Sequence, residues 1–293
     1  MNYKIIEQNG KVIVENLQDF ELPHIFECGQ CFRWNKEEDG SYTGVAKGRI
    51  MNVQKKGEQI IFDHTTKDDF IHIWKKYFDL DRDYDAIKEQ LSQNDAVMKK
   101  AVTHGYGIRI LNQDVWETLI SFIISSNKGI QMIKRSIESL SERYGTFLGV
   151  YRGRKYYDFP TPEALLNKSI EEIRKSHMGY RAKYIVDTAA VVAEKQINLY
   201  NLKNLSTEDA RTQLIRLSGV GPKVSDCILL FSVEKTDAFP IDVWVKRVME
   251  YFYVPEGTGL KEIQHFAQNK FKGYAGFAQQ YLFYYARELG IGK

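Results

Sequence analysis

The first 65 residues alternate apolar and polar positions in short runs that are separated by turn signals. The paired runs are 3–7 with 11–14, 31–34 with 42–45 and 50–53 with 59–62, and the dipeptides between them are Asn9-Gly10, Asp39-Gly40 and Lys56-Gly57. Asn-Gly and Asp-Gly favour tight turns between antiparallel strands. Short strands at this spacing predict a small twisted antiparallel sheet.

Near residue 66 the pattern changes to the 3.6-residue repeat of amphipathic helices. The first predicted helix begins at Asp68, with acidic residues in its first turn. Further predicted helices cover 115–126, 131–144, 161–176, 182–196 and 277–289. Strands followed by helices predict an α+β fold. We expect an N-terminal sheet domain with flanking helices over 1–105 and a larger all-α region over 106–293.

The composition is that of an ordinary soluble protein, with 43% hydrophobic residues, 27% charged residues and a net charge of +3. This charge permits binding to nucleic acid without arguing for it. No apolar run approaches the roughly 18 residues of a membrane helix. The first residues lack the apolar stretch of a secretory signal. We therefore expect a cytoplasmic protein that does not associate with membranes.

Cys28-Gly29-Gln30-Cys31 has the spacing of a redox pair or of half a zinc site. A structural zinc site needs four ligands, and the only other cysteine is Cys227. A redox pair normally opens a helix in a βαβ unit, whereas the residues that follow here predict a strand. A thiol oxidoreductase remains an alternative, which predicts that replacing either Cys28 or Cys31 abolishes activity.

The stretch 206–233 predicts two helices joined by a tight hairpin. Ser206 is a suitable N-cap for the first helix, and Pro222 suits the first position of the second. Gly219 and Gly221 allow positive φ in the turn between them. Backbone N–H groups at such a turn can bind a phosphate without reading base sequence. An ordinary helix–helix turn is the alternative.

Lys223 and Asp242 are the clearest candidates for catalytic residues. Lys223 lies in the first turn of a helix, where a cation opposes the helix dipole at a cost of about 0.3–1 kcal/mol. Partial burial would also favour the neutral amine, which can act as a nucleophile. Asp242 ends the loop 236–243 at the start of the next predicted helix, where a simple N-cap is the alternative.

The segments 217–224 and 239–243 resemble the helix-hairpin-helix and Gly/Pro-rich Asp motif of base-excision DNA glycosylases. Further segments are similar to motifs of one branch, the 8-oxoguanine DNA glycosylases. These segments are Cys28-Gly29-Gln30-Cys31-Phe32-Arg33-Trp34, Phe122-Ile123-Ile124-Ser125-Ser126-Asn127, Gly179-Tyr180-Arg181-Ala182-Lys183-Tyr184 and the stretch from Ala275 to Phe283. The resemblance thus covers most of the chain.

This resemblance implies a bifunctional glycosylase and abasic-site lyase. Lys223 would attack C1′ of the damaged nucleotide, displace the base and form a Schiff base that allows β-elimination. Asp242 would stabilise positive charge on the sugar and assist proton transfers. The implied partner is double-stranded DNA that contains 8-oxoguanine, and we expect the enzyme to act as a monomer.

The resemblance also implies how the base is recognised. The Gly29 carbonyl would accept the N7–H that 8-oxoguanine has and guanine lacks, so guanine would bring an acceptor against an acceptor. Phe283 and Cys227 would sandwich the flipped base, and Gln279 would bind its Watson–Crick edge.

Several residues are implied to contact the rest of the DNA. Tyr180, followed by Arg181, would wedge into the gap left in the stack, and filling this gap matters because flipping costs a few kcal/mol. Asn127 would face the orphaned base. The hairpin residues Gly219, Gly221 and Val224 are further candidates for binding the DNA backbone.

Two positions depart from the family pattern. Met132 replaces an arginine that contacts the orphaned cytosine in well-known eukaryotic members, and a thioether cannot make bidentate hydrogen bonds. We therefore expect a weaker preference for cytosine opposite the lesion. Trp244 stands at a DNA-contacting position where relatives often have a phosphate-binding histidine, and we do not expect it to make that histidine's phosphate contact.

No cofactor is expected to be required. The backbone carbonyls of Leu217 and Val220 could hold a monovalent or divalent cation, as in relatives. Iron–sulfur relatives carry four C-terminal cysteines, and none follows Cys227 here, so no cluster is expected. Two further alternatives stay open: a monofunctional alkylpurine glycosylase would need Asp242 without Lys223, and a non-catalytic DNA-binding module would need neither.

Overall fold

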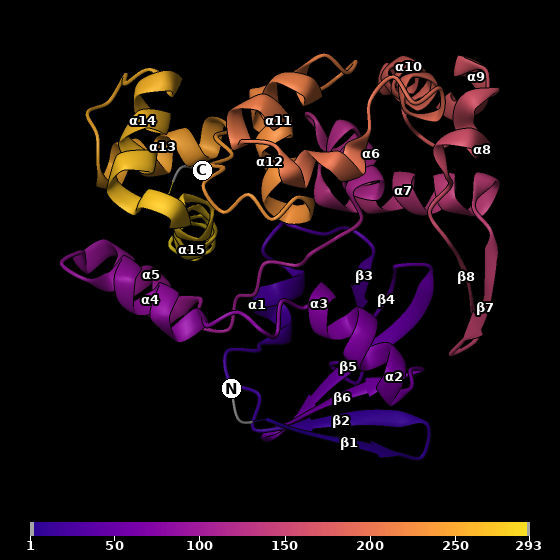
Figure 1. Cartoon of the computed structure of the whole chain (residues 1–293), viewed down its shortest axis with the longest axis horizontal. Helices are drawn as coiled ribbons and strands as arrows, with labels where there is room; N and C mark the ends of the chain where they lie inside the picture. The colour runs from indigo at the N-terminus through magenta and orange to yellow at the C-terminus, as the bar shows by residue number, and fades with distance from the viewer. Residues whose placement is uncertain (1–2, 292–293) are drawn as a thin grey trace.

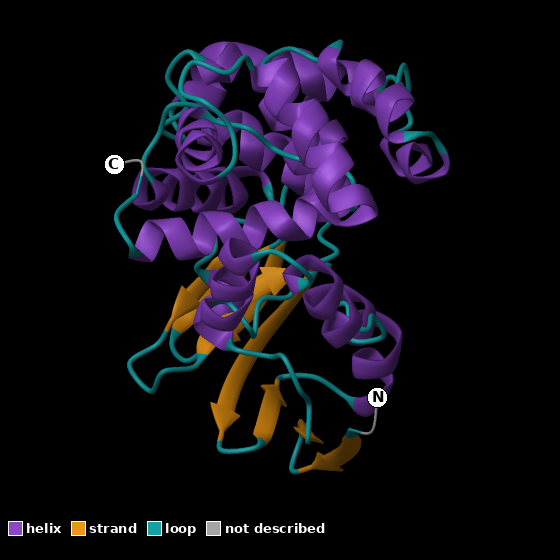
Figure 2. Cartoon of the chain, turned by 90° about the vertical axis from the view of Figure 1, so that its left-hand side faces the viewer, coloured by secondary structure: helices purple, strands orange, loops and turns teal. Residues whose placement is uncertain are grey.

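The computed structural model describes residues 3–291, in which a β-sheet lies below a larger group of helices (Figures 1 and 2). The sheet is antiparallel and six-stranded, in the order β1-β2-β6-β5-β4-β3. Its strands are β1 (Lys4–Gln8), β2 (Lys11–Glu15), β3 (Trp34–Lys36), β4 (Tyr42–Ala46), β5 (Arg49–Lys56) and β6 (Gln59–Asp63). The predicted α+β fold with an N-terminal antiparallel sheet is therefore confirmed. Met1 and Asn2, where the sequence was inspected for a secretory signal, lie outside the described residues.

Tight turns pair strands that follow one another in the sequence. Asn9 and Gly10 have φ values of 53° and 71°, so the predicted hairpin between β1 and β2 is confirmed. Lys47 and Gly48 form a similar turn between β4 and β5, with φ values of 52° and 69°, which the sequence analysis did not predict. The predicted strand at 31–34 is wrong except at Trp34, because residues 27–33 form a loop that tertiary hydrogen bonds hold in place.

Short helices pack on this sheet. They are α1 (Leu22–Phe26), α2 (Lys67–Asp69), the π-helical η1 (Phe70–Trp74) and α3 (Lys75–Tyr77). Thr66 caps α2 by accepting the backbone N–H of Asp69, so a helix does begin where the sequence predicts it. The core between the helices and the sheet is aromatic, with buried Phe20, Phe62 and Phe78 in edge or tilted contact.

The helical region contains most of the remaining chain. Its elements are α4 (Tyr84–Ser92), α5 (Ala96–His104), α6 (Val115–Ser125), α7 (Ile130–Tyr144), α8 (Pro162–Leu166), α9 (Ile170–Arg174), α10 (Arg181–Ala193), η2 (Leu199–Asn204), α11 (Thr207–Ile215), α12 (Pro222–Ser232), α13 (Val243–Phe252), α14 (Leu260–Phe271), η3 (Lys272–Tyr274) and α15 (Ala275–Glu288). The single helix predicted over 161–176 is wrong, because Ser169 and Glu172 form a capping box that starts a new helix there. Among residues 3–291, no helix combines the length and apolar character needed to cross a bilayer.

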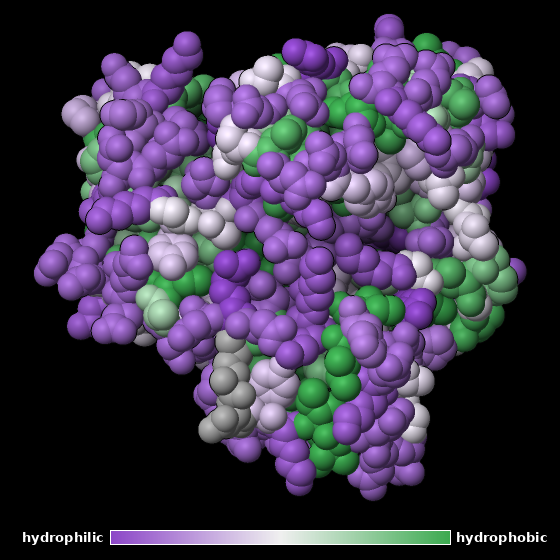
Figure 3. All heavy atoms as spheres, viewed as in Figure 1, coloured by the Kyte–Doolittle hydropathy of each residue, from purple (hydrophilic) through white to green (hydrophobic). Residues whose placement is uncertain are grey.

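A two-stranded hairpin, β7 (Phe147–Tyr151) and β8 (Arg154–Tyr157), projects from the helices toward the sheet (Figure 1). This hairpin was not predicted, although Arg152 and Gly153 have the paired positive φ values, 48° and 77°, of a tight turn. The side chains of Phe147 and Val150 are 52% and 58% exposed. Apolar side chains accordingly gather over this hairpin, and a further apolar area lies at the lower centre of the same face (Figure 3).

Two hydrophobic cores organise the chain. The first joins residues of the sheet and its short helices up to Leu80, together with Leu111. The second joins the helices from α4 onward and also includes Cys28 and Phe32. Since α4 and α5 share the second core and α5 packs on α15, these helices associate with the C-terminal region. That residues 1–105 form a domain of their own stays a prediction.

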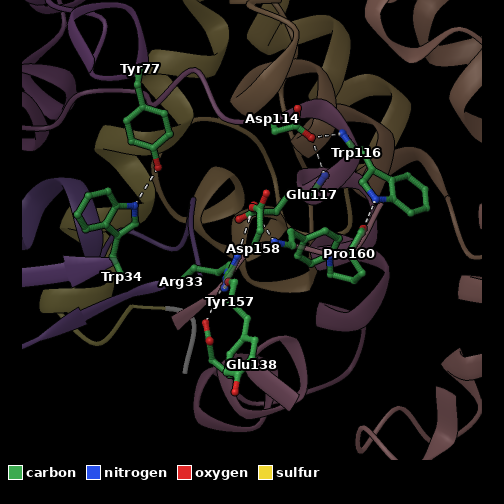
Figure 4. Close-up of polar contacts among 11 residues, drawn as sticks. Arg33, Trp34, Tyr77, Asp114, Trp116, Glu117, Glu138, Tyr157, Asp158 and Pro160 are labelled. Atoms are coloured by element: carbon green, nitrogen blue, oxygen red, sulfur yellow. Dashed lines mark hydrogen bonds and ion pairs between the residues drawn. The ribbon is translucent and has the colours of Figure 1, made fainter. Parts of the chain in front are cut away.

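Arg33 ties the loop before β3 to the helical region (Figure 4). Its Nε donates to Glu138 at 3.1 Å, and its Nη2 donates to the Tyr157 carbonyl at 2.6 Å. Glu117, near the start of α6, lies 3.9 Å from Nη1 of the same guanidinium. Burial raises the pKa of Glu117 to about 7, against the opposing effect of Arg33. A buried arginine with two carboxylate neighbours therefore anchors the loop that carries Gly29.

Candidate active site

A small cavity of about 60 Å³ lies where α6, α12, α13, α15 and the loop before β3 meet. The residues lining it are Cys28, Gly29, Phe122, Lys223, Cys227, Phe231, Pro240, Asp242, Val245, Gln279, Gln280 and Phe283. Both predicted catalytic residues and all four predicted base-recognition residues are among them. Segments far apart in the sequence thus bring these side chains to one place.

Lys223 is the second residue of α12, directly after the hairpin. Gly221 is the N-cap of this helix and Pro222 takes its first position, as the sequence predicts. The Lys223 side chain is half-buried, and its Nζ lies 5.1 Å from the centroid of the Phe122 ring. In the sequence, Phe122 stands out only as part of a motif. Its place under the lysine comes from the packing of α6 against α12.

Asp242 is the N-cap of α13, and its Oδ1 accepts the backbone N–H of Val245 at 2.7 Å. The capping interpretation of Asp242 is therefore confirmed. Because Asp242 also lines the cavity, capping is compatible with a role in chemistry. The hydrogen bond to Val245 fixes the carboxylate beside the cavity in a defined orientation.

Gly29 lies in the left-handed region with a φ of +84°, which favours glycine. A Cβ at this position would lie 3.6 Å from Cε1 of Phe283, so the backbone and the ring are close neighbours. The adjacent Gln30 holds the loop: its Nε2 donates to the carbonyls of Ile25 and Arg109 at 2.9 and 2.7 Å. Its Oε1 accepts the N–H of Leu111 at 2.8 Å. These three bonds fix the backbone next to Gly29.

The cysteines are buried, reduced thiols. Burial raises the pKa of Cys28 and of Cys227 to about 11, and it raises the pKa of Cys31 further. Lys223, one helical turn before Cys227, opposes this shift without cancelling it. Because the thiolate is the reactive form in redox exchange, this burial argues against the thiol oxidoreductase alternative.

Gln279 is 5% exposed and projects from α15 into the cavity wall. Its Oε1 accepts a hydrogen bond from Nε2 of Gln280 at 2.7 Å. Gln280, which was not among the predicted site residues, also lines the cavity. The bond between the two side chains orients the Gln279 amide.

The predicted DNA-contacting residues differ in exposure. Tyr180 is 55% exposed at the start of α10, Met132 is 41% exposed on α7, and Asn127 is exposed at the turn after α6 with a φ of 50°. Arg181 is 7% exposed, and its guanidinium donates to the carbonyls of Ser126 and Asn127. Arg181 thus holds the turn that presents Asn127, and a direct contact between Arg181 and DNA stays a prediction.

The hairpin between α11 and α12 has two different glycines. Gly219 has a φ of +80°, and a Cβ there would lie 2.8 Å from Cδ2 of Tyr184, so a side chain does not fit. A Cβ on Gly221 would meet nothing within 4 Å. Val224 is buried, so its side chain belongs to the core.

The hairpin carbonyls are compatible with the predicted cation. The Leu217 carbonyl accepts the Val220 N–H at 3.1 Å, which leaves one of its lone pairs for another partner. Within residues 3–291, no group of three or more His, Cys, Asp or Glu side chains could hold a metal ion. Any cation here would thus depend on backbone oxygens, and its presence stays a prediction.

Trp244 lies behind the cavity wall. Its ring meets the Phe283 ring edge to face, with 4.6 Å between the centroids and an angle of 74° between the planes. Its Nε1–H donates to the carbonyl of Ile291. The structure thus places Trp244 against one of the predicted base-recognition residues.

Comparisons with known proteins agree with this geometry. Residues 12–119 match the family model "8-oxoguanine DNA glycosylase, N-terminal domain", and residues 120–272 match the "HhH-GPD superfamily base excision DNA repair protein" model. The solved 8-oxoguanine glycosylase/lyase of Clostridium acetobutylicum, in complex with double-stranded DNA containing cytosine opposite 8-oxoguanine, is 45% identical. The match has a TM-score of 0.96 and covers 99% of this chain and 100% of that one.

Curated relatives extend beyond bacteria. The N-glycosylase/DNA lyase of Saccharomyces cerevisiae is 31% identical over a region that covers 99% of this chain and 88% of that protein. A probable N-glycosylase/DNA lyase of Methanothermobacter thermautotrophicus is 33% identical over 63% of this chain and 65% of its own length. The chain therefore belongs to the 8-oxoguanine DNA glycosylase family of helix-hairpin-helix base-excision DNA repair enzymes.

Proposed function

We propose that this protein excises 8-oxoguanine from duplex DNA by base flipping and then cleaves the strand at the resulting site. The observation that carries the proposal is the arrangement of Lys223 and Asp242 at the starts of α12 and α13, where both line one cavity. The same cavity is lined by Gly29 and Gln279, which offer a backbone carbonyl and an amide for reading a base.

In the proposed reaction, Nζ of Lys223 forms a bond to C1′ while the bond from C1′ to N9 of the base breaks. The departing base takes the electron pair and accepts the proton that Nζ loses on forming the new bond. Opening of the sugar then gives a Schiff base, which makes the C2′ proton acidic. Loss of that proton expels the 3′ phosphate by β-elimination. The Asp242 carboxylate stabilises the positive charge that develops on the sugar.

Base recognition would follow from the N7–H of 8-oxoguanine. The Gly29 carbonyl accepts this proton, whereas guanine would present its own N7 lone pair and leave two acceptors facing each other. The base would stack between Phe283 and Cys227.

On the surrounding DNA, exposed Tyr180 would fill the gap in the stack and Asn127 would face the orphaned base. Backbone N–H groups of the hairpin would bind a phosphate. The space beside Gly221 is open, since a Cβ there would meet nothing within 4 Å. A monomer is sufficient for this scheme, since every proposed group comes from one chain. A cytoplasmic location, at the nucleoid when the protein is bound to DNA, stays a prediction.

We also propose a relaxed preference for the base opposite the lesion. Met132 is exposed on α7, close in sequence to the Asn127 turn, and its thioether offers no hydrogen-bond donor. A side chain without donors cannot select cytosine by paired hydrogen bonds.

The test uses duplexes with a single 8-oxoguanine opposite each of the four bases, and a matched duplex with an alkylated purine. Base release and strand cleavage are measured separately, the latter without alkali. We expect release and cleavage for 8-oxoguanine, no cleavage with Lys223→Gln, and little release with Asp242→Asn. Release of the alkylated purine alone, with no strand cleavage, would instead support the monofunctional alternative.

A further inference from the structure

Trp244 and Phe283 form a pair of rings at the edge of the base pocket. Phe283 lines the cavity from α15, whereas Trp244 is the second residue of α13 and is absent from the cavity lining. Their edge-to-face contact has 4.6 Å between the centroids. Such an aromatic pair contributes more stabilising energy than the burial of its surface area alone, and it restricts how each ring can move.

The indole is itself held from its other end. Nε1 of Trp244 donates to the carbonyl of Ile291, which follows the end of α15. The chain there forms a Schellman cap, in which Gly290 has a φ of +68° and the N–H of Ile291 donates to the Ala286 carbonyl at 3.0 Å. The cap therefore sets the position of the carbonyl that binds Trp244.

Together these contacts join helices α13 and α15 at two points. Helix α15 carries Phe283 and, through its cap, the acceptor for Trp244, while α13 carries Trp244 two residues after Asp242. The indole has no positive charge, and its one N–H already has a partner. It therefore has little left to offer a DNA phosphate.

We propose that Trp244 is a positioning residue, which holds the Phe283 ring at the place where the flipped base stacks, and that the Ile291 carbonyl fixes Trp244. This inference rests on the proposed function, since it requires Phe283 to contact the base. Trp244 acts only through Phe283. A substrate that has no base to stack should therefore be insensitive to it.

The experiment compares two duplexes, one with 8-oxoguanine and one with an abasic site, under single turnover with excess enzyme. Trp244→Ala should slow processing of the 8-oxoguanine duplex about 2- to 12-fold, the range expected for an aromatic pair. Cleavage of the abasic duplex should keep its wild-type rate. Trp244→Phe keeps a ring but loses the N–H, so its effect should be smaller and in the same direction.

Trp116→Phe is the matched control, because it also removes an indole N–H bonded to a backbone carbonyl, that of Pro160 at 2.8 Å, away from the cavity. Trp116→Phe should not change the rate on one duplex relative to the rate on the other. The melting temperature of each variant reports whether it is folded. Equal rates of Trp244→Ala and wild type on 8-oxoguanine, or equal losses on both duplexes, would overturn the inference. If the wild-type protein cleaves neither duplex, the proposed function itself fails.

Discussion

Nζ of Lys223 lies 5.1 Å from the centroid of the Phe122 ring. The ring belongs to α6, and the same helix leads into the turn at Asn127, which is proposed to face the orphaned base. One helix therefore supports both the proposed nucleophile and a proposed contact to the orphaned base. The wall under Lys223 is aromatic and continuous, because Phe122 stacks on Phe231 with 5.6 Å between centroids.

Replacing Phe122 with leucine should slow the formation of the covalent adduct several-fold, because the ring that packs against the Lys223 side chain and positions its amine is lost. Phe20→Leu is the control, since it removes a buried ring from the other core. The rate of borohydride trapping on an 8-oxoguanine duplex checks this. Equal trapping rates in the two variants would show that the contact has no role in catalysis.

Gly29→Ala should reduce both stability and excision. A side chain at a φ of +84° costs about 1–2 kcal/mol, and the new methyl group would lie beside Phe283 in the base pocket. Gly40→Ala is matched in backbone strain, with a φ of +78° and no neighbour within 4 Å. Thermal unfolding should show similar losses for both variants, whereas excision of 8-oxoguanine should fall only in Gly29→Ala. An equal fall in excision by both variants would show that Gly29 has no specific role in base recognition.

The two hairpin glycines should respond differently to alanine. Gly219→Ala should destabilise the fold because its Cβ would clash with Tyr184. Gly221→Ala should fold normally but bind DNA roughly tenfold more weakly, because the methyl group would face the proposed phosphate. No charge changes, so the salt dependence of its binding should match that of the wild type. Wild-type affinity of Gly221→Ala, measured by titration, would place the phosphate elsewhere.

Met132→Arg should create a preference for cytosine opposite the lesion, by roughly tenfold or more, because a guanidinium supplies paired donors. Gln131→Arg adds the same charge at the neighbouring exposed position and should raise excision without such selectivity. Excision rates opposite all four bases decide the point. A wild-type enzyme that already acts only opposite cytosine would refute the role of Met132.

Glu117→Gln should stabilise the protein in a pH-dependent way. The pKa of Glu117 is raised to about 7 in the fold by burial, so the folded protein keeps a proton that the unfolded chain releases from about pH 4.5 upward. Ionisation of Glu117 therefore lowers the free energy of unfolding as the pH rises from about 4.5 to about 7. The advantage of Glu117→Gln should be near zero at pH 4 and grow to as much as about 3 kcal/mol above pH 7.

Glu138→Gln is the natural comparison, because it removes the carboxylate that binds Nε of Arg33 directly. It should destabilise the protein at neutral pH, opposite in sign to Glu117→Gln. Urea unfolding at several pH values measures both. A difference between Glu117→Gln and wild type that does not change from pH 5 to pH 8 would contradict the account.

Features with local causes could be predicted from the sequence. The helix-hairpin-helix follows from Ser206, Pro222 and glycines at the turn, and the first hairpin follows from Asn9-Gly10. The positions of Lys223 and Asp242 at helix starts, together with the resemblance to known motifs, identified six of the twelve residues that line the cavity. These inferences succeed because caps, turns and motifs depend on a few neighbouring residues.

Features that depend on distant contacts could not be predicted. The loop around Gly29 is held by Gln30, two of whose three hydrogen-bond partners lie near residue 110, so the apparent strand at 31–34 does not form as predicted. The contacts of Lys223 with Phe122 and of Trp244 with Phe283 each join separate helices. Periodicity identifies these rings as buried or half-buried but does not identify their partners.

The identity of the nucleophile is the central claim, and it can be measured directly. The protein is incubated with a duplex containing one 8-oxoguanine, the adduct is reduced with borohydride, and the modified peptide is identified by mass spectrometry. We predict that the sugar remnant is found on Lys223 and that Lys223→Gln yields no adduct while it still binds the duplex. An adduct on another amine, or undiminished trapping by Lys223→Gln, would contradict the account.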